Sequence, residues 1–197
     1  MRLSIAAKIC AAAVLAFPAL AHADTASDIV KIFGRDPGKA EAHACFVRRY
    51  AKEDFVSHPK RNVTDMLVYM QKSEGDDPNY GLNFQVHFKR LDKPFQAYGS
   101  CLPDEKGKKT FSCGIDCDGG GVEISVKDTQ SFVLAIPNYA RVMDLENPDP
   151  TVDLPAGTEF LDEDKLFQMQ RTALKDCLPL IYDEAIKAKI NQGVLTQ

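Results

Sequence analysis

Hydrophobic and polar residues alternate with a period of two through much of the chain between residues 62 and 136. The clearest stretch is 82–88, whose apolar positions are Leu82, Phe84, Val86 and Phe88. Such alternation is typical of strands with one buried and one solvated face. The pattern predicts strands over residues 44–50, 66–70, 82–88, 95–101, 109–115, 121–127, 132–136 and 139–145. Residues 166–170 are either one more short strand or part of a helix that starts at Asp162.

Helical periodicity is confined to the two ends of the chain. Residues 25–34 predict a short helix with Ile29, Ile32 and Phe33 on one face. A helical turn is expected over 172–177, followed by a C-terminal helix over 181–192. Turns separate most strands at intervals of about 8–12 residues, and no helical crossover lies between them. We therefore expect a mainly β fold: an antiparallel barrel of about eight strands with short terminal helices, or alternatively a two-sheet sandwich.

The first 23 residues have the organisation of a secretory signal peptide. Arg2 and Lys8 supply a positive start, residues 9–20 are apolar, and Ala21-His22-Ala23 is a small-x-small cleavage pattern. Cleavage is expected before Asp24. Residues 24–197 would then form a single disulfide-stapled β domain, exported to the periplasm or the extracellular space, with no transmembrane segment in the mature chain.

The mature chain would retain five cysteines: Cys45, Cys101, Cys113, Cys117 and Cys177. An oxidising compartment favours disulfides, and an odd number leaves one thiol free or paired outside the chain. We expect one local bridge within the group Cys101, Cys113 and Cys117. The second bridge is expected to link Cys45 to Cys177 and so connect the two ends of the domain.

The chain contains 24 basic and 28 acidic residues, a formal charge of −4. Removal of a leader that carries Arg2 and Lys8 would lower this to −6. An acidic protein repels phosphate backbones, so nucleic acid is not an expected partner.

Two local basic clusters stand out against the acidic background. They consist of Arg48, Arg49 and Tyr50, and of Lys60 and Arg61. These five residues are the surface-binding candidates, suited to an anionic ligand or an acidic partner. The alternative is that they are ordinary solvated surface charges.

The sequence contains no complete metal, cofactor or catalytic motif. Cys113-x3-Cys117 lacks further ligands at suitable spacing, and Asp116–Gly121 matches only half of a calcium loop. The acidic stretch that follows Asp144 reads as a solvated, proline-rich loop. Ser57-His58 lacks the context of a nucleophile elbow. No catalytic, cofactor-binding or metal-binding residue is therefore nominated.

Three functions remain, in order of preference. The first is a non-enzymatic exported binding module that engages a protein or an envelope component through its surface. The second is a barrel that carries a small apolar ligand, and the third is a secreted hydrolase without a recognisable motif. The barrel interior distinguishes the first function from the second, because an eight-stranded barrel is either filled by side chains or holds one small ligand. The bulky residues expected inside are Met66, Met70, Phe84, Phe88, Phe95 and Phe132.

Overall fold

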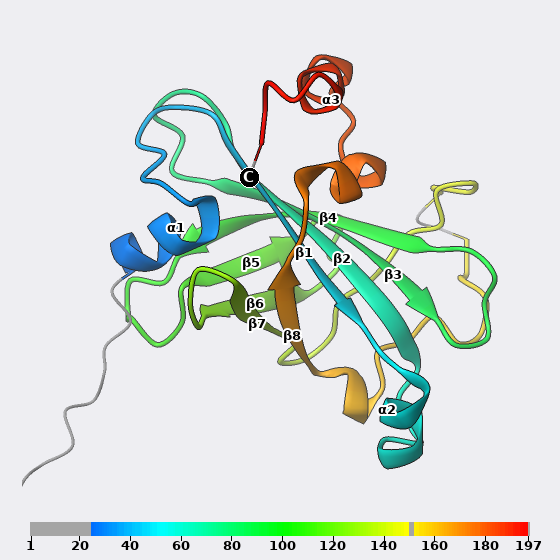
Figure 1. Cartoon of the computed structure of the whole chain (residues 1–197). Coiled ribbons are helices and arrows are strands. Elements are labelled where there is room, and N and C mark those ends of the chain that lie inside the picture. Colours follow the sequence, from blue (N-terminus) through cyan, green and yellow to red (C-terminus); the bar gives the residue numbers. More distant parts are fainter. Residues whose placement is uncertain (1–24, 150–151, 197) are drawn as a thin grey trace, which may run out of the picture.

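The computed structural model describes residues 25–149 and 152–196 and is mainly β, with eight antiparallel strands that close into a barrel (Figure 1). Each strand pairs with the next along the chain, and β8 pairs with β1. The strands are β1 (Ala42–Arg49), β2 (Val63–Lys72), β3 (Tyr80–Phe88), β4 (Phe95–Pro103), β5 (Phe111–Ile115), β6 (Gly121–Val126), β7 (Ser131–Ala135) and β8 (Leu166–Arg171). The prediction of a barrel is confirmed, and the sandwich alternative is wrong. The expected signal peptide lies outside the described residues.

Side chains fill the interior of the barrel. Alternation along each strand sends every second residue inward, and the six bulky residues expected there are each at most 2% exposed. The rings also contact one another: Phe46 lies edge-on to Phe132 at 4.5 Å between centroids, and Phe88 lies 5.9 Å from Phe95. Such packing is the usual outcome for an eight-stranded barrel.

Both ends of the barrel are covered. At one end lies helix α1 (Thr25–Phe33), which buries Ile32 and Phe33 against the core. Arg171 anchors this helix, because its guanidinium donates to the carbonyl oxygens of Lys31 and Ile32 and lies over the ring of Phe46. At the other end Phe160 packs edge-on against three phenylalanines, namely Phe84, Phe88 and Phe167.

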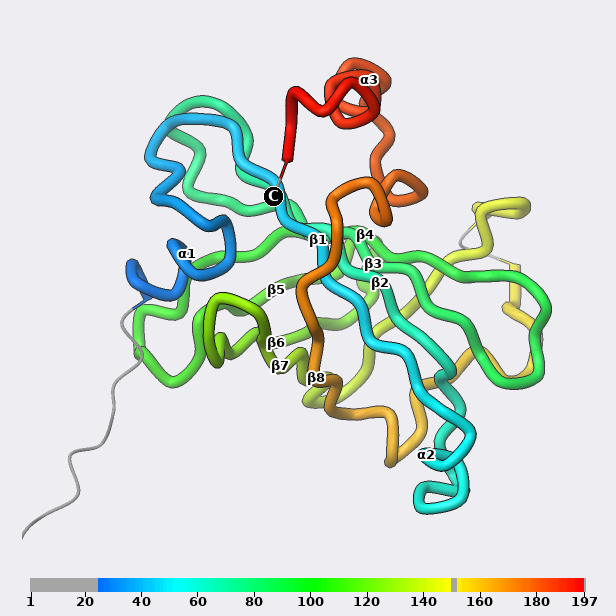
Figure 2. The backbone as a smooth tube through the Cα atoms, in the orientation of Figure 1, coloured from blue at the N-terminus to red at the C-terminus, as the bar shows by residue number. Residues whose placement is uncertain are grey.

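The last part of the chain, residues 172–196, lies across the outer face of β1 to β3 and is called the C-terminal strap (Figures 1 and 2). It contains the 3₁₀ helix η2 (Leu174–Leu180) and helix α3 (Glu184–Asn191). The strap buries a second apolar cluster outside the barrel, in which Leu180 and Ile186 pack with Leu67 and Tyr69. The expected C-terminal helix begins three residues later than predicted, because the Asp183 side chain caps it.

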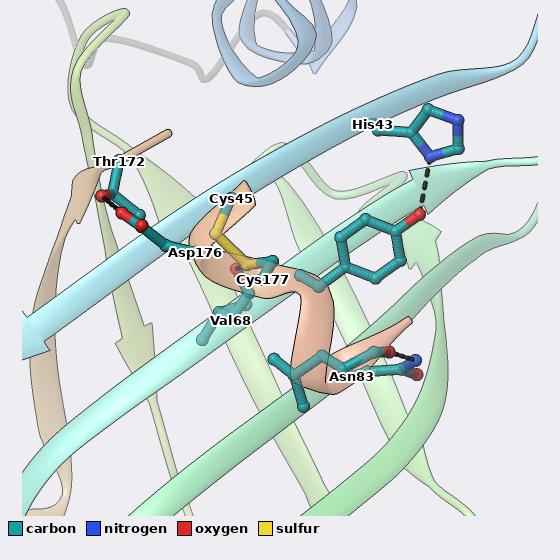
Figure 3. Close-up of a disulfide and its surroundings, with 9 residues drawn as sticks. His43, Cys45, Val68, Asn83, Thr172, Asp176 and Cys177 are labelled. Atoms are coloured by element: carbon teal, nitrogen blue, oxygen red, sulfur yellow. Dashed lines mark hydrogen bonds between the residues drawn. A yellow bond between two sulfur atoms is a disulfide. The ribbon is translucent and has the colours of Figure 1, made fainter. Parts of the chain in front are cut away.

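A disulfide between Cys45 and Cys177 joins the strap to β1, as the sequence predicts (Figure 3). Beside it, the amide of Asn83 donates to the carbonyl oxygen of Leu180 at 2.8 Å. Further along β1, His43 Nδ1 lies 2.6 Å from the hydroxyl of Tyr69. Burial lowers the pKa of His43 and raises that of Tyr69. Both groups therefore remain neutral near pH 7, and their hydrogen bond satisfies polar atoms next to the strap.

The expected strand over residues 139–145 is wrong. This segment makes only isolated bridges, from Ala140 to Gly120, from Met143 to Gln96 and from Asp144 to Asn147. Strand β4 pairs with β5 only from Gly99 onward, and Met143 occupies the open edge before that point through two backbone hydrogen bonds to Gln96. The segment is therefore held by single bridges and forms no ladder.

Three shorter elements complete the description. Residues 166–170 belong to strand β8, and the short 3₁₀ helix η1 (Asp162–Asp164) precedes it. Helix α2 (Lys52–Ser57) follows β1 and was not predicted, since six residues are too few to show a helical period. In the part of the chain that the structure describes, no helix has the length and apolar character needed to span a membrane.

The local disulfide is the one between Cys101 and Cys113. These residues lie directly opposite each other in the register of β4 and β5, whereas Cys117 lies in the turn after β5. The thiol of Cys117 is free and exposed.

We predict that one thiol per chain reacts with a thiol-specific chromogenic reagent in the folded protein. The reason is that Cys117 is exposed while the other four described cysteines are bonded. Absorbance titration of the folded protein, with Cys117→Ser as the control, measures the number of reactive thiols per chain. A reactive thiol that persists in Cys117→Ser would contradict the pairing.

Candidate basic binding groove

A groove of about 560 Å³ lies at the end of the barrel where α2 leads into β2. Three segments far apart in the sequence form its walls: residues 59–62 before β2, residues 89–90 after β3, and residues 157–165 before β8. Since consecutive strands run in opposite directions, the end of β3 and the starts of β2 and β8 meet at the same end of the barrel.

Positive charge dominates the groove. Its lining includes two acidic residues, Glu159 and Asp162, and five basic ones, an excess of three positive charges. The basic residues are Lys60, Arg61, Lys89, Arg90 and Lys165. Within residues 25–149 and 152–196, none of these five forms a salt bridge with a carboxylate.

Outside the groove, six of the twelve lysines in the described residues are paired with carboxylates, for example Lys39 with Asp76 at 2.7 Å and Lys187 with Glu184 at 2.7 Å. The groove therefore gathers five cations that form no salt bridge, within a chain whose formal charge is −4. This local potential attracts anions.

Aromatic rings contact two of these cations, Arg61 and Lys89, and also the neighbouring Arg48. The guanidinium carbons of Arg48 and Arg61 lie 4.5 and 3.9 Å from the centroid of the Tyr50 ring. Phe55 of α2 lies edge-on to Tyr50 at 6.4 Å, and the ammonium of Lys89 is 5.1 Å from the Phe55 centroid. Cation–π contacts of this kind restrict the side chains, so less conformational entropy is lost when an anion binds.

The carboxylate of Asp164 joins two walls of the groove. It is fully buried and accepts hydrogen bonds from the backbone N–H groups of Asn62, Val63 and Leu161 at 2.9 to 3.3 Å. The Asn62 amide adds bonds to the carbonyl oxygens of residues 157 and 159. Burial raises the pKa of Asp164 above 3.8. This network fixes the position of Arg61, the residue that precedes Asn62.

The structure brings together four of the five surface-binding candidates. Arg48, Tyr50 and Arg61 form one stack, and Lys60 lines the groove beside Arg61. Arg49 is not part of this group, because neighbouring strand residues point to opposite faces, and its register partner is Asp65 on β2. Arg49 is exposed on the outer face of β1, and its role as a binding candidate stays a prediction.

Sequence reasoning missed the other half of the groove. Lys89 and Arg90 directly follow the clearest strand, and Lys165 directly precedes β8. A pair of adjacent basic residues at the end of a strong strand was the only available signal. Their convergence with Lys60 depends on the pairing of β2 with β3 and on the closure of the barrel.

The remaining sequence motifs form no catalytic or metal centre in the described part of the chain. Ser57 Oγ lies 3.1 Å from His58 Nδ1 on the exposed end of α2, and its other polar contacts are backbone carbonyl oxygens. Lys93 Nζ lies 2.7 Å from carboxylate oxygens of both Asp144 and Glu146. No group of three or more metal-ligating side chains occurs among residues 25–149 and 152–196.

No protein-family model, curated protein or solved structure matches the chain. The class of this protein is therefore defined from its fold and its groove alone. The class is an eight-stranded antiparallel barrel with a filled interior, two disulfides and a basic groove at one end.

Proposed function

We propose that the protein is a non-enzymatic exported binding module, periplasmic or extracellular, that engages an anionic partner through the basic groove. The partner is an acidic protein or an anionic envelope component. One observation carries the proposal: five cations without carboxylate partners converge in a groove whose walls are fixed by Asp164 and by stacked aromatic rings. Two disulfides support export, because such bonds persist in oxidising compartments.

The packing of the barrel favours binding at the surface over carriage of an apolar ligand. A carrier needs an internal cavity of about 300 Å³ or more and an open mouth. Here Phe84 and Phe132 are fully buried in the interior, α1 covers one end, and Phe160 packs into the other. Surface binding requires no rearrangement of these elements.

The groove is tested by titration with short soluble polyanions, a ten-residue glutamate peptide and inorganic tripolyphosphate. Two-dimensional NMR of the ¹⁵N-labelled chain is expected to show shifts confined to the groove and α2. We predict that the double variant Lys60→Ala/Arg90→Ala binds both probes about 30-fold more weakly at low salt. The estimate assumes about 1 kcal/mol for each charge lost.

The matched control is Lys106→Ala/Lys108→Ala. It also removes two exposed basic residues, here both lysines, but from the turn between β4 and β5 at the opposite end of the barrel. Equal loss of affinity in both double variants would mean that only net charge matters, and the proposed groove would be rejected. Absence of polyanion binding by the unmodified protein would reject it as well.

A further inference from the structure

The surface next to the groove carries exposed apolar side chains as well as cations. Val56 on α2 is 83% exposed, the highest value among the exposed large hydrophobic residues, and Leu161 in the groove lining is 43% exposed. Leu166, at the start of β8, is 63% exposed and follows Lys165. Three apolar side chains are therefore open to solvent at the same barrel end as the five cations.

We propose that this end of the barrel docks on an anionic lipid bilayer, with lipid phosphates in the basic groove and Val56 and Leu161 inserted between the headgroups. This proposal rests on the proposed function and narrows its partner to a membrane surface. The cations attract the phosphate layer, and the apolar tips add binding that does not depend on charge.

Charge complementarity favours this partner and sets the orientation. The chain as a whole is negative, so an anionic bilayer repels most of its surface, while the groove has an excess of three positive charges. The protein would approach with α2 and the groove first. The attractive field extends only about one Debye length, roughly 10 Å at 0.1 M salt, so contact requires this end to face the membrane.

The distribution of apolar residues favours a membrane over an acidic protein. A protein interface usually has a contiguous core from which charged residues are depleted. Here charged residues lie between the apolar side chains: Lys60 and Arg61 follow α2 in the chain, and the acidic residues 162–164 together with Lys165 separate Leu161 from Leu166. Isolated apolar side chains among charged ones suit the interfacial region of a bilayer, which accepts both.

Rigidity of the site supports the same partner. Phe55, the neighbour of Val56 on α2, contacts both Tyr50 and Lys89. These contacts hold α2 against the groove, so that Val56 and the cations move as one unit. A preformed surface of this kind binds without a folding cost.

The test is co-sedimentation of the disulfide-intact protein with vesicles of phosphatidylglycerol and phosphatidylcholine in equal parts. Vesicles of phosphatidylcholine alone are the reference. We expect binding to the anionic vesicles only, with most of it lost at 0.5 M salt. Lys60→Ala/Arg90→Ala should lower the partition coefficient about 30-fold, since each cation near the surface contributes about fivefold. Lys106→Ala/Lys108→Ala should retain it.

Apolar insertion is tested separately with Val56→Ser, for which the matched control is Val194→Ser. Val194 is 67% exposed and lies near the C-terminus, after α3. We expect Val56→Ser to weaken vesicle binding several-fold and to leave tripolyphosphate binding unchanged. Val194→Ser should change neither.

The outcomes separate this proposal from the proposed function. If anionic vesicles fail to bind while the glutamate peptide or tripolyphosphate still shifts the groove resonances, membrane docking is overturned and the binding module stands. If neither vesicles nor polyanions bind, both are overturned. Equal vesicle binding by Val56→Ser and the unmodified protein would overturn insertion and leave a purely electrostatic contact.

Discussion

Replacement of both Cys45 and Cys177 by alanine is expected to lower the free energy of unfolding by about 4–5 kcal/mol. The bridge closes a loop of 132 residues, and the chain-entropy model assigns values of this size to loops longer than 100 residues. The bridge also holds the strap, which buries Leu180 and Ile186 on the outer face of the barrel. Urea unfolding followed by circular dichroism measures the change.

The second disulfide supplies the comparison. Cys101 and Cys113 are only 12 residues apart and already face each other in paired strands, so their replacement should cost about 3 kcal/mol or less. A larger loss for this pair than for Cys45 and Cys177 would contradict the assignment of the long bridge as the main covalent constraint. Reduction of both bridges should then be at least as destabilising as either double replacement.

The second large effect is expected at Asp164. Asp164→Ala removes the acceptor for three backbone N–H groups and should lower the free energy of unfolding by about 3–5 kcal/mol, since each buried donor left without a partner costs about 1–3 kcal/mol. The same change should weaken polyanion binding, because Asn62 and the neighbouring Arg61 lose their anchor. Chemical unfolding and the tripolyphosphate titration measure the two effects.

Two variants make the Asp164 experiment specific. Asp162→Ala removes an exposed carboxylate from the groove lining and should change stability little. Asp164→Asn keeps one acceptor oxygen and should fall between the alanine variant and the unmodified protein. A polyanion affinity unchanged in Asp164→Ala would contradict the role of this residue in positioning Arg61.

The pH dependence follows from the same carboxyl group. Burial raises the pKa of Asp164 above 3.8, so the folded state holds this proton more tightly than the unfolded state. The stabilising contribution of the group is complete below pH 3.8 and decreases as pH rises through the raised folded-state pKa. The stability difference between the unmodified protein and Asp164→Asn should therefore be larger at pH 3.5 than at pH 7, if urea midpoints are compared at each pH.

The sequence by itself determined most of the strands and their inner faces. Strict alternation along residues 82–88 identified β3, and all four of its apolar positions are buried, because a period of two matches the geometry of a strand. The pairing of Cys45 with Cys177 was predicted as a link between the ends of the domain. Basic clusters at Arg48 to Tyr50 and at Lys60-Arg61 were visible as local composition.

Only the tertiary structure decided how these pieces combine. Closure of β8 on β1 selected the barrel over the sandwich, and residues 139–145 contact the strands only through isolated bridges. In the register of β4 and β5, Cys113 and not Cys117 lies opposite Cys101, so the disulfide forms between Cys101 and Cys113. The groove forms because strand pairing places Lys89 and Lys165 beside Lys60, whereas the pleat separates Arg49 from the groove. Contacts between residues this far apart depend on register and closure, which local periodicity does not encode.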